Sequence, residues 1–114
     1  MVRLHPRELM KPISIEAGKP VKLEDMKRRP PALALEASQG LDALSRKDFR
    51  DLVVKRLEME PRDKELVILD KGAYTIDQLI EEVREETDVG KVVMESEKKF
   101  MKHLLSLLER GEIE

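Results

Sequence analysis

Prolines constrain the first part of this chain more than any other residue type. Five of the six prolines lie within residues 1–31, and Pro61 is the only one that follows. Because proline lacks a backbone N–H and biases the preceding residue away from helical conformation, this segment cannot form a long helix. Residues 13–15 and 21–23 alternate between apolar and polar side chains, which is typical of short half-buried strands. We therefore interpret residues 1–31 as an extended Pro-rich arm that could add a small strand pair.

Helical signals begin directly after the last of these prolines. Residues 32–44 are rich in strong helix formers, which predicts a first helix. Ser45 is a natural N-cap for a second helix, with the acidic Asp48 three positions later. We expect this helix to run to about Glu60 and to stop at Pro61, because proline cannot continue a helix.

Two further helices are predicted in the C-terminal part of the chain. Thr75 and Gln78 have the spacing of a capping box and precede an apolar stripe with helical period. A last helix is expected over about 91–110, with Gly111 in the position of a C-terminal glycine cap. Because residues 87–90 interrupt the helical pattern, we expect the last two helices to form an αα-hairpin.

One short strand completes the predicted secondary structure. Residues 66–69 are four consecutive apolar residues between charged neighbours and Gly72, a pattern typical of a buried strand. The predicted fold is therefore mainly α: a helical domain over 32–114 with three to four helices and one short strand near 65–69. The arm over residues 1–31 is expected to be dispensable for folding of that domain. An α+β fold is the alternative if the arm forms strands.

The last helix is expected to be apolar over more than half of its circumference. A domain in a chain of 114 residues has limited surface with which to cover so broad a face. We therefore predict that part of this face binds a protein partner or a second copy of the chain. The predicted partner interface consists of Val93, Met94, Phe100, Met101, Leu104, Leu105 and Leu108.

Two charged residues fall inside the apolar stripes of predicted helices. Arg56 lies in the stripe of the second helix, and Glu97 lies near the centre of the face of the last one. A buried charge without a partner is too costly to persist, so each needs a counter-ion or a route to water. We predict that Arg56 and Glu97 form a buried ion pair, within one chain or between chains. The alternative is that each reaches solvent from the rim of its stripe.

The arm is basic, although the whole chain has a net charge of −2. Residues 1–33 carry eight Lys and Arg against four Asp and Glu. Cations in such an arm could contact phosphates without sequence preference, which makes a nucleic-acid-associated protein the second functional hypothesis. The alternative is a solvated linker, or an arm that packs on the acidic helices of the same chain. The candidate nucleic-acid contacts are Lys22, Lys27, Arg28 and Arg29.

The chain lacks the residues that several kinds of catalytic and metal-binding site require. It contains no cysteine, which excludes a disulfide framework, a thiolate metal site and a cysteine nucleophile. The five glycines are scattered, and the histidines His5 and His103 have no neighbouring ligands at metal-binding spacing. We therefore predict no catalytic residue, no cofactor, no metal and no small-molecule substrate. An enzyme would need a pocket that joins Glu97 or His103 to other polar groups.

These observations lead to one preferred hypothesis for location and function. No apolar run approaches the ~18 residues that a membrane span requires, and the N-terminus lacks the apolar core of a secretory signal. We expect a cytoplasmic protein, and its Lys, Arg and Glu usage is typical of thermophilic proteins. The expected function is that of a non-enzymatic protein–protein interaction module. This small accessory or structural subunit would self-associate or dock on a larger partner through its last helix and its arm.

Overall fold

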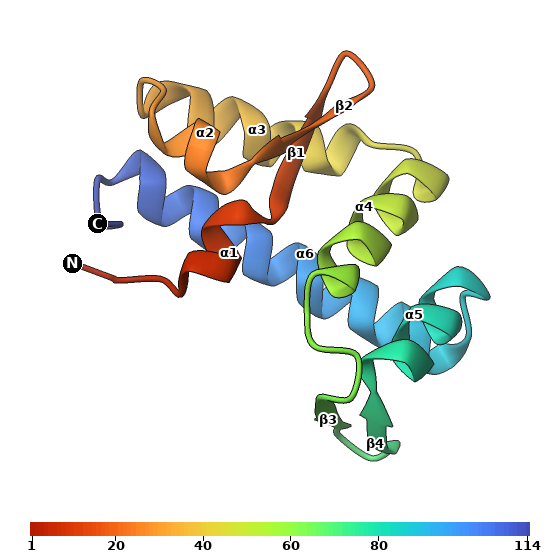
Figure 1. The fold of residues 1–114 in the computed structure, drawn as a ribbon. Coiled ribbons are helices and arrows are strands. Elements are labelled where there is room, and N and C mark those ends of the chain that lie inside the picture. Colours follow the sequence, from red (N-terminus) through yellow and green to blue (C-terminus); the bar gives the residue numbers. More distant parts are fainter.

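The computed structural model describes all residues, 1–114, and contains six helices and two small antiparallel sheets (Figure 1). The helices are α1 (Pro6–Met10), α2 (Leu23–Lys27), α3 (Ala32–Ala43), α4 (Arg46–Glu58), α5 (Ile76–Arg84) and α6 (Asp88–Glu109). The strands are β1 (Pro12–Glu16), β2 (Lys19–Lys22), β3 (Glu65–Ile68) and β4 (Gly72–Thr75). The architecture is mainly helical, and its two sheets also fit the α+β alternative.

The longest helix, α6, is the axis around which the rest of the chain packs. Helices α3 and α5 lie against it, α4 packs against α5 and β1, and β1 also contacts α3 (Figure 1). The buried apolar side chains form one continuous core of 25 residues. None of the helices combines the length and the apolar composition that crossing a bilayer requires.

Local capping signals place the helix boundaries. Ser45 caps α4 by accepting a hydrogen bond from the Asp48 backbone N–H, and Thr75 and Gln78 form the predicted capping box at α5. Helix α6 begins three residues earlier than expected, because the Thr87 side chain accepts a hydrogen bond from the Gly90 N–H. At its other end Gly111 has φ +69°, the left-handed conformation for which glycine is suited.

Gly90 allows α5 and α6 to approach each other closely. A Cβ atom built on Gly90 would lie 2.0 Å from the carbonyl oxygen of Glu82 in α5. No side chain fits in that space, so a glycine is required where the first turn of α6 meets the backbone of α5. The start of α6 therefore packs closely against the last turn of α5.

The prediction of an extended arm over residues 1–31 is wrong. Residues 6–27 form α1, the β1–β2 hairpin and α2, and apolar side chains from this segment belong to the main core. Ile13 and Leu23 are fully buried, and Met26 is almost fully buried. Two of the prolines fit these elements because they occupy positions whose backbone N–H makes no hydrogen bond within the element. Pro6 lies in the first turn of α1, and Pro12 is the first residue of β1. The proposed boundary at residue 31 therefore divides a single core.

The strand near 65–69 is not a single buried strand. β3 pairs with β4 in an antiparallel hairpin, with Leu66 opposite Tyr74 and Ile68 opposite Gly72. Only alternate side chains face the core: Leu66 and Ile68 are half-buried, whereas Val67 is 76% exposed. The four apolar residues in a row resemble a strand covered on both faces, but one face of this two-stranded sheet is open to solvent.

The predicted partner interface on α6 is also largely wrong. The broad apolar face of α6 is covered by α3 and α5 and joins a core that includes the N-terminal segment. Helical periodicity gives the width of an apolar face, but not the elements that cover it. The structure leaves Phe100 accessible, and the other six predicted residues are buried within the chain: Val93, Met94, Met101, Leu104, Leu105 and Leu108.

Candidate functional site

An apolar groove lies where the β3–β4 hairpin meets the helices. It has a volume of about 230 Å³, and side chains from α4, α5, α6 and β3 form its walls. Its apolar lining consists of Leu57, Leu66, Ile68, Leu79, Val93 and Phe100. The exposed Ser96 and the half-buried Glu97, both on α6, supply its polar groups. Below we call this feature the hairpin groove.

Apolar side chains are exposed at the wall of the hairpin groove and on the hairpin itself. Phe100 is 42% exposed at its wall, and Leu69 at the hairpin tip is 86% exposed. Val67 is also exposed, on the face of β3 that points away from the groove. Sequence reasoning selected Val93 and Phe100 but missed the hairpin, although the run of apolar residues at 66–69 carried the signal. Val67 and Leu69 are exposed because no other part of the chain covers the outer face and the tip of the hairpin.

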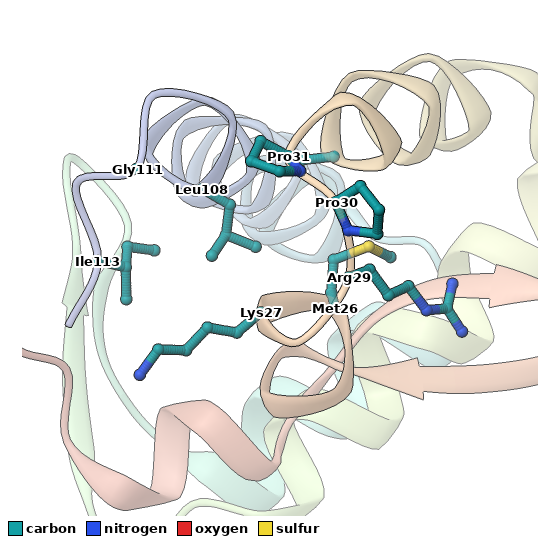
Figure 2. A pocket seen from close by; sticks show the side chains of 9 residues that line it. Met26, Lys27, Arg29, Pro30, Pro31, Leu108, Gly111 and Ile113 are labelled. Atoms are coloured by element: carbon teal, nitrogen blue, oxygen red, sulfur yellow. The ribbon is translucent and has the colours of Figure 1, made fainter.

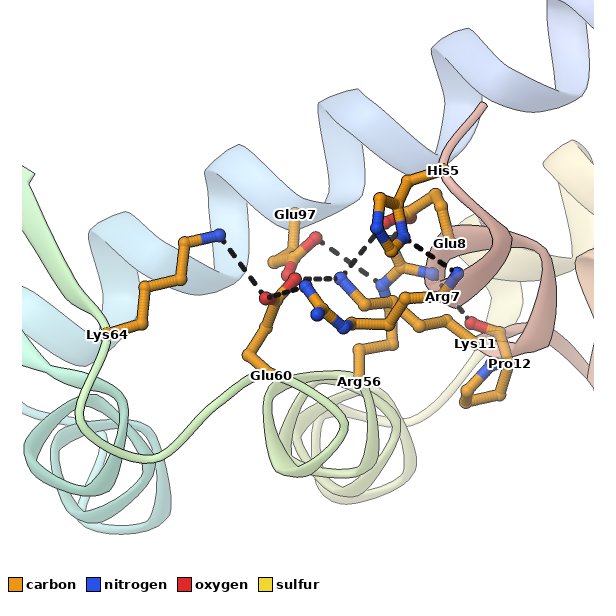
Figure 3. Close-up of polar contacts among 9 residues, drawn as sticks. All are labelled: His5, Arg7, Glu8, Lys11, Pro12, Arg56, Glu60, Lys64 and Glu97. Atoms are coloured by element: carbon orange, nitrogen blue, oxygen red, sulfur yellow. Dashed lines mark hydrogen bonds and ion pairs between the residues drawn. The ribbon is translucent and has the colours of Figure 1, made fainter. Parts of the chain in front are cut away.

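Behind the groove, Arg56 is the centre of a buried polar network (Figure 3). Its side chain is 1% exposed. Its guanidinium donates to the Pro12 carbonyl oxygen at 2.8 Å, to Glu8 Oε1 at 2.7 Å and to Glu97 Oε2 at 3.4 Å. The structure thus places Arg56 and Glu97 in contact within one chain, and adds two N-terminal partners that the sequence did not indicate.

A second cation extends this network to the end of α4 (Figure 3). The Lys11 side chain is almost fully buried, and its Nζ lies 2.9 Å from Glu8 Oε2 and 2.5 Å from Glu60 Oε1. Glu60 also pairs with Arg7 at 3.3 Å and with Lys64 at 3.2 Å. Because these ion pairs join α1 and the following residue to α4 and its C-terminal loop, the network fastens the N-terminal segment to the helices.

The cations around Glu60 lower the pKa of its carboxyl group. Burial alone raises the pKa of the Glu60 carboxyl, but hydrogen bonds and charge from Lys11 and Lys64 outweigh it and lower the pKa below its usual value. A carboxyl whose pKa is lower in the folded than in the unfolded chain stabilises the fold above the unfolded pKa of ~4.3. That stabilisation is lost as the pH falls through the lower, folded pKa.

We therefore expect the free energy of unfolding to decrease as the pH is lowered from 6 to 3, and Glu60→Gln to make this decrease shallower. Urea unfolding at a series of pH values measures both. Glu95→Gln, at an exposed position on α6, serves as the control and should leave the pH profile unchanged. If the two variants had the same pH profile as the unmodified chain, the role assigned to the Glu60 pairs would be wrong.

Two of the four candidate nucleic-acid contacts are paired with carboxylates of the same chain. Arg28 pairs with Glu24 at 3.5 Å, and Arg29 pairs with Glu16. Lys22 at the end of β2 and Lys27 at the end of α2 are exposed and have no ion-pair partner within the chain. The hydrogen bond to Glu16 raises the pKa of the Arg29 guanidinium further, so it stays charged but already has a carboxylate partner.

The cations at the start of α4 belong to a different part of the surface. Arg46 and Arg50 both pair with Glu86, whose pKa these contacts lower. Helix α3 separates them from α2; its 12 residues span about 18 Å. The basic residues at 22–29 and those at 46–50 therefore do not merge into one patch.

A second cavity, of about 180 Å³, joins residues from two of the predicted sites (Figure 2). Lys27 and Arg29 lie on one side of it and Leu108 of α6 on another, with Ile113 near the C-terminus. The loop with Pro30 and Pro31 brings them together because it turns the chain from α2 into α3. Leu108 is thus covered by the segment that the sequence had assigned to a separate arm.

The histidines lie apart from the hairpin groove. His5 caps α1, with its Nδ1 accepting a hydrogen bond from the Arg7 N–H, and His103 is exposed on α6. The structure contains no group of three or more His, Asp or Glu side chains arranged to hold a metal ion.

Comparison of the chain with protein-family models, curated proteins and solved structures found no significant match.

Proposed function

We propose that this chain is a non-enzymatic protein–protein interaction module, a small accessory or structural subunit that self-associates through the hairpin groove. The observation that carries the proposal is the exposed apolar surface of the groove and its hairpin: Phe100 on the groove wall, Leu69 at the hairpin tip and Val67 on the outer face of β3. Contiguous exposed apolar surface rimmed by polar residues is typical of protein-binding sites.

The groove has the features of an interface that binds by burial of apolar surface. Removing a large apolar side chain from water contributes about 1.5–3 kcal/mol, and partly exposed aromatic residues are frequent anchors at such sites. Phe100 and the half-buried Leu66 and Ile68 can still lose accessible surface when a partner covers them. This proposal replaces the broad face of α6 with the part of that helix between Val93 and Phe100 and the adjacent hairpin.

The acidic side chains near the groove support a binding role over a catalytic one. Glu8, Glu60 and Glu97 are each held by at least one buried or half-buried cation of the Arg56 network. Burial raises the pKa of the Glu60 carboxyl, but Lys11 and Lys64 lower it below its usual value, whereas a general acid needs a raised pKa. A cytoplasmic location is part of the proposal and rests on the cysteine-free composition.

The experiment that tests the proposal is size-exclusion chromatography with light scattering on the full chain over a wide range of concentrations. We expect a dimer of about 26 kDa, twice the chain mass of 13.2 kDa. Phe100→Ser should weaken this dimer by about 10- to 100-fold, because it removes one large apolar contact from each copy.

The control is Leu35→Ser, which changes a similarly exposed apolar residue on α3, away from the hairpin. It should leave the dimer unchanged. Thermal unfolding of both variants verifies that they fold. A 13 kDa particle at all concentrations, or equal effects of the two substitutions, would contradict the proposal.

A further inference from the structure

The tip of the β3–β4 hairpin presents an exposed apolar side chain, Leu69, beside Asp70 and Lys71, two exposed charged residues without an ion-pair partner in the chain. The turn is well held: the Lys71 N–H donates to the Ile68 carbonyl oxygen at 2.9 Å, and the Tyr74 hydroxyl donates to the Lys71 carbonyl oxygen at 3.0 Å. A turn fixed in this way loses little entropy when it binds.

The hairpin groove has the complementary chemistry. Its lining is apolar except for Ser96 and the carboxylate of Glu97. The Glu97 side chain is partly exposed, and its ion pair with Arg56 is long at 3.4 Å, because Arg56 pairs more closely with Glu8. The groove therefore offers apolar walls and a carboxylate that retains acceptor capacity for a second donor.

We propose that the occupant of the hairpin groove is the hairpin tip of a second copy of this chain, with Leu69 among the apolar walls and Lys71 near Glu97. This inference rests on the proposed self-association and adds the residues that each copy contributes. A two-fold dimer requires one surface that is complementary to itself. The hairpin end of the molecule meets this requirement because it carries both the hairpin tip, with the Lys71 cation, and the groove, with the Glu97 carboxylate. The hairpin projects from the helices at that end (Figure 1).

The arrangement is reciprocal, so each dimer contains two equivalent tip-in-groove contacts. Leu69→Ser removes the apolar tip from both contacts and should weaken the dimer by about 10- to 100-fold, like Phe100→Ser, which damages both grooves. Leu69 is 86% exposed, so its substitution should leave folding of the chain intact. Leu35→Ser again serves as the matched control.

Mixing the two variants gives the decisive result. A heterodimer of Leu69→Ser with Phe100→Ser combines an intact tip with an intact groove in one contact and places both defects in the other. A damaged groove costs little where the tip is already lost. Each homodimer has two defective contacts and the heterodimer has only one, so the heterodimer should be about 3- to 10-fold tighter than either homodimer. Native mass spectrometry of the mixture distinguishes the three dimers by mass.

The charged contact is tested in the same assay. Lys71→Glu should raise the dissociation constant about two- to five-fold, and less at high salt, as expected for a partly exposed ion pair. In the background of Glu97→Gln, which removes the carboxylate charge, the effect of Lys71→Glu should become smaller. Thermal unfolding of Glu97→Gln verifies that this variant is folded.

The results for the variants distinguish failure of the tip-in-groove arrangement from failure of self-association itself. A dimer that Phe100→Ser weakens and Leu69→Ser does not would overturn the tip-in-groove arrangement while leaving the proposed function intact. Homodimers and heterodimers of equal affinity would show that like residues meet across the interface, which also overturns it. A chain that stays monomeric at all concentrations would overturn both the proposed function and this inference.

Discussion

Replacing Arg56 by alanine is expected to lower the free energy of unfolding by about 3–5 kcal/mol, the cost of removing one partner from a buried ion pair. The substitution leaves Glu8 and Glu97 without their shared cation in a largely buried site. It also removes the donor to the Pro12 carbonyl oxygen and leaves a cavity in α4. Because folded domains are stable by only about 5–15 kcal/mol, this loss is a large part of the total.

Urea unfolding followed by circular dichroism measures the change. Arg62→Ala is the matched control: Arg62 pairs with Asp77 at 2.7 Å, but its side chain is half exposed. Exposed ion pairs contribute about 0–1 kcal/mol, so this variant should stay close to the unmodified chain. A loss below 1 kcal/mol for Arg56→Ala would contradict the role of the network as the fastening of the N-terminal segment.

Deletion of residues 1–31 is expected to abolish cooperative folding, the opposite of what the proline pattern predicts. The deletion removes Ile13, Leu23 and Met26 from the core, and each such side chain contributes about 1.5–3 kcal/mol when buried. It also removes Glu8 and the Pro12 carbonyl oxygen, two partners of the guanidinium in α4. Together these losses are comparable with the whole stability of a small domain.

Far-UV circular dichroism and urea unfolding of the shortened chain, 32–114, test this expectation. The control lacks only residues 1–3, which contribute the bridge between Val2 and Ile113 and an exposed pair of Arg3 with Glu114. It should remain folded, with a small loss of stability. A sharp, cooperative urea transition for 32–114 would show that the N-terminal segment is an accessory to the core.

Arg56 and Glu97 show which part of the buried network the sequence predicts and which part it does not. Helical periodicity placed Arg56 and Glu97 inside apolar stripes, and the cost of an unpaired buried charge then required partners. The structure places them 3.4 Å apart. It also gives Arg56 a closer partner, Glu8, from a segment that periodicity had separated from the core. Charge balance demands a partner but does not identify it.

At the β3–β4 hairpin the sequence pattern predicted burial that the structure does not show. Leu66 to Leu69 read as a buried strand because four apolar residues in a row usually have cover on both faces. In the folded chain β4 pairs with this strand and the helices cover one face only, so Val67 and Leu69 remain exposed. The apolar groove next to them is made by side chains from four separate elements, and no local pattern contains it.

The sequence by itself determined the features that depend on neighbouring residues: the caps at Ser45 and Thr75, the glycine at 111 and the mainly helical content. These follow from hydrogen bonds and backbone preferences over three or four positions. Only the tertiary structure decided that residues 6–27 belong to the core, that α6 is covered within the chain, and that the hairpin stays open. Burial is set by which distant elements meet, and that depends on packing of the whole chain.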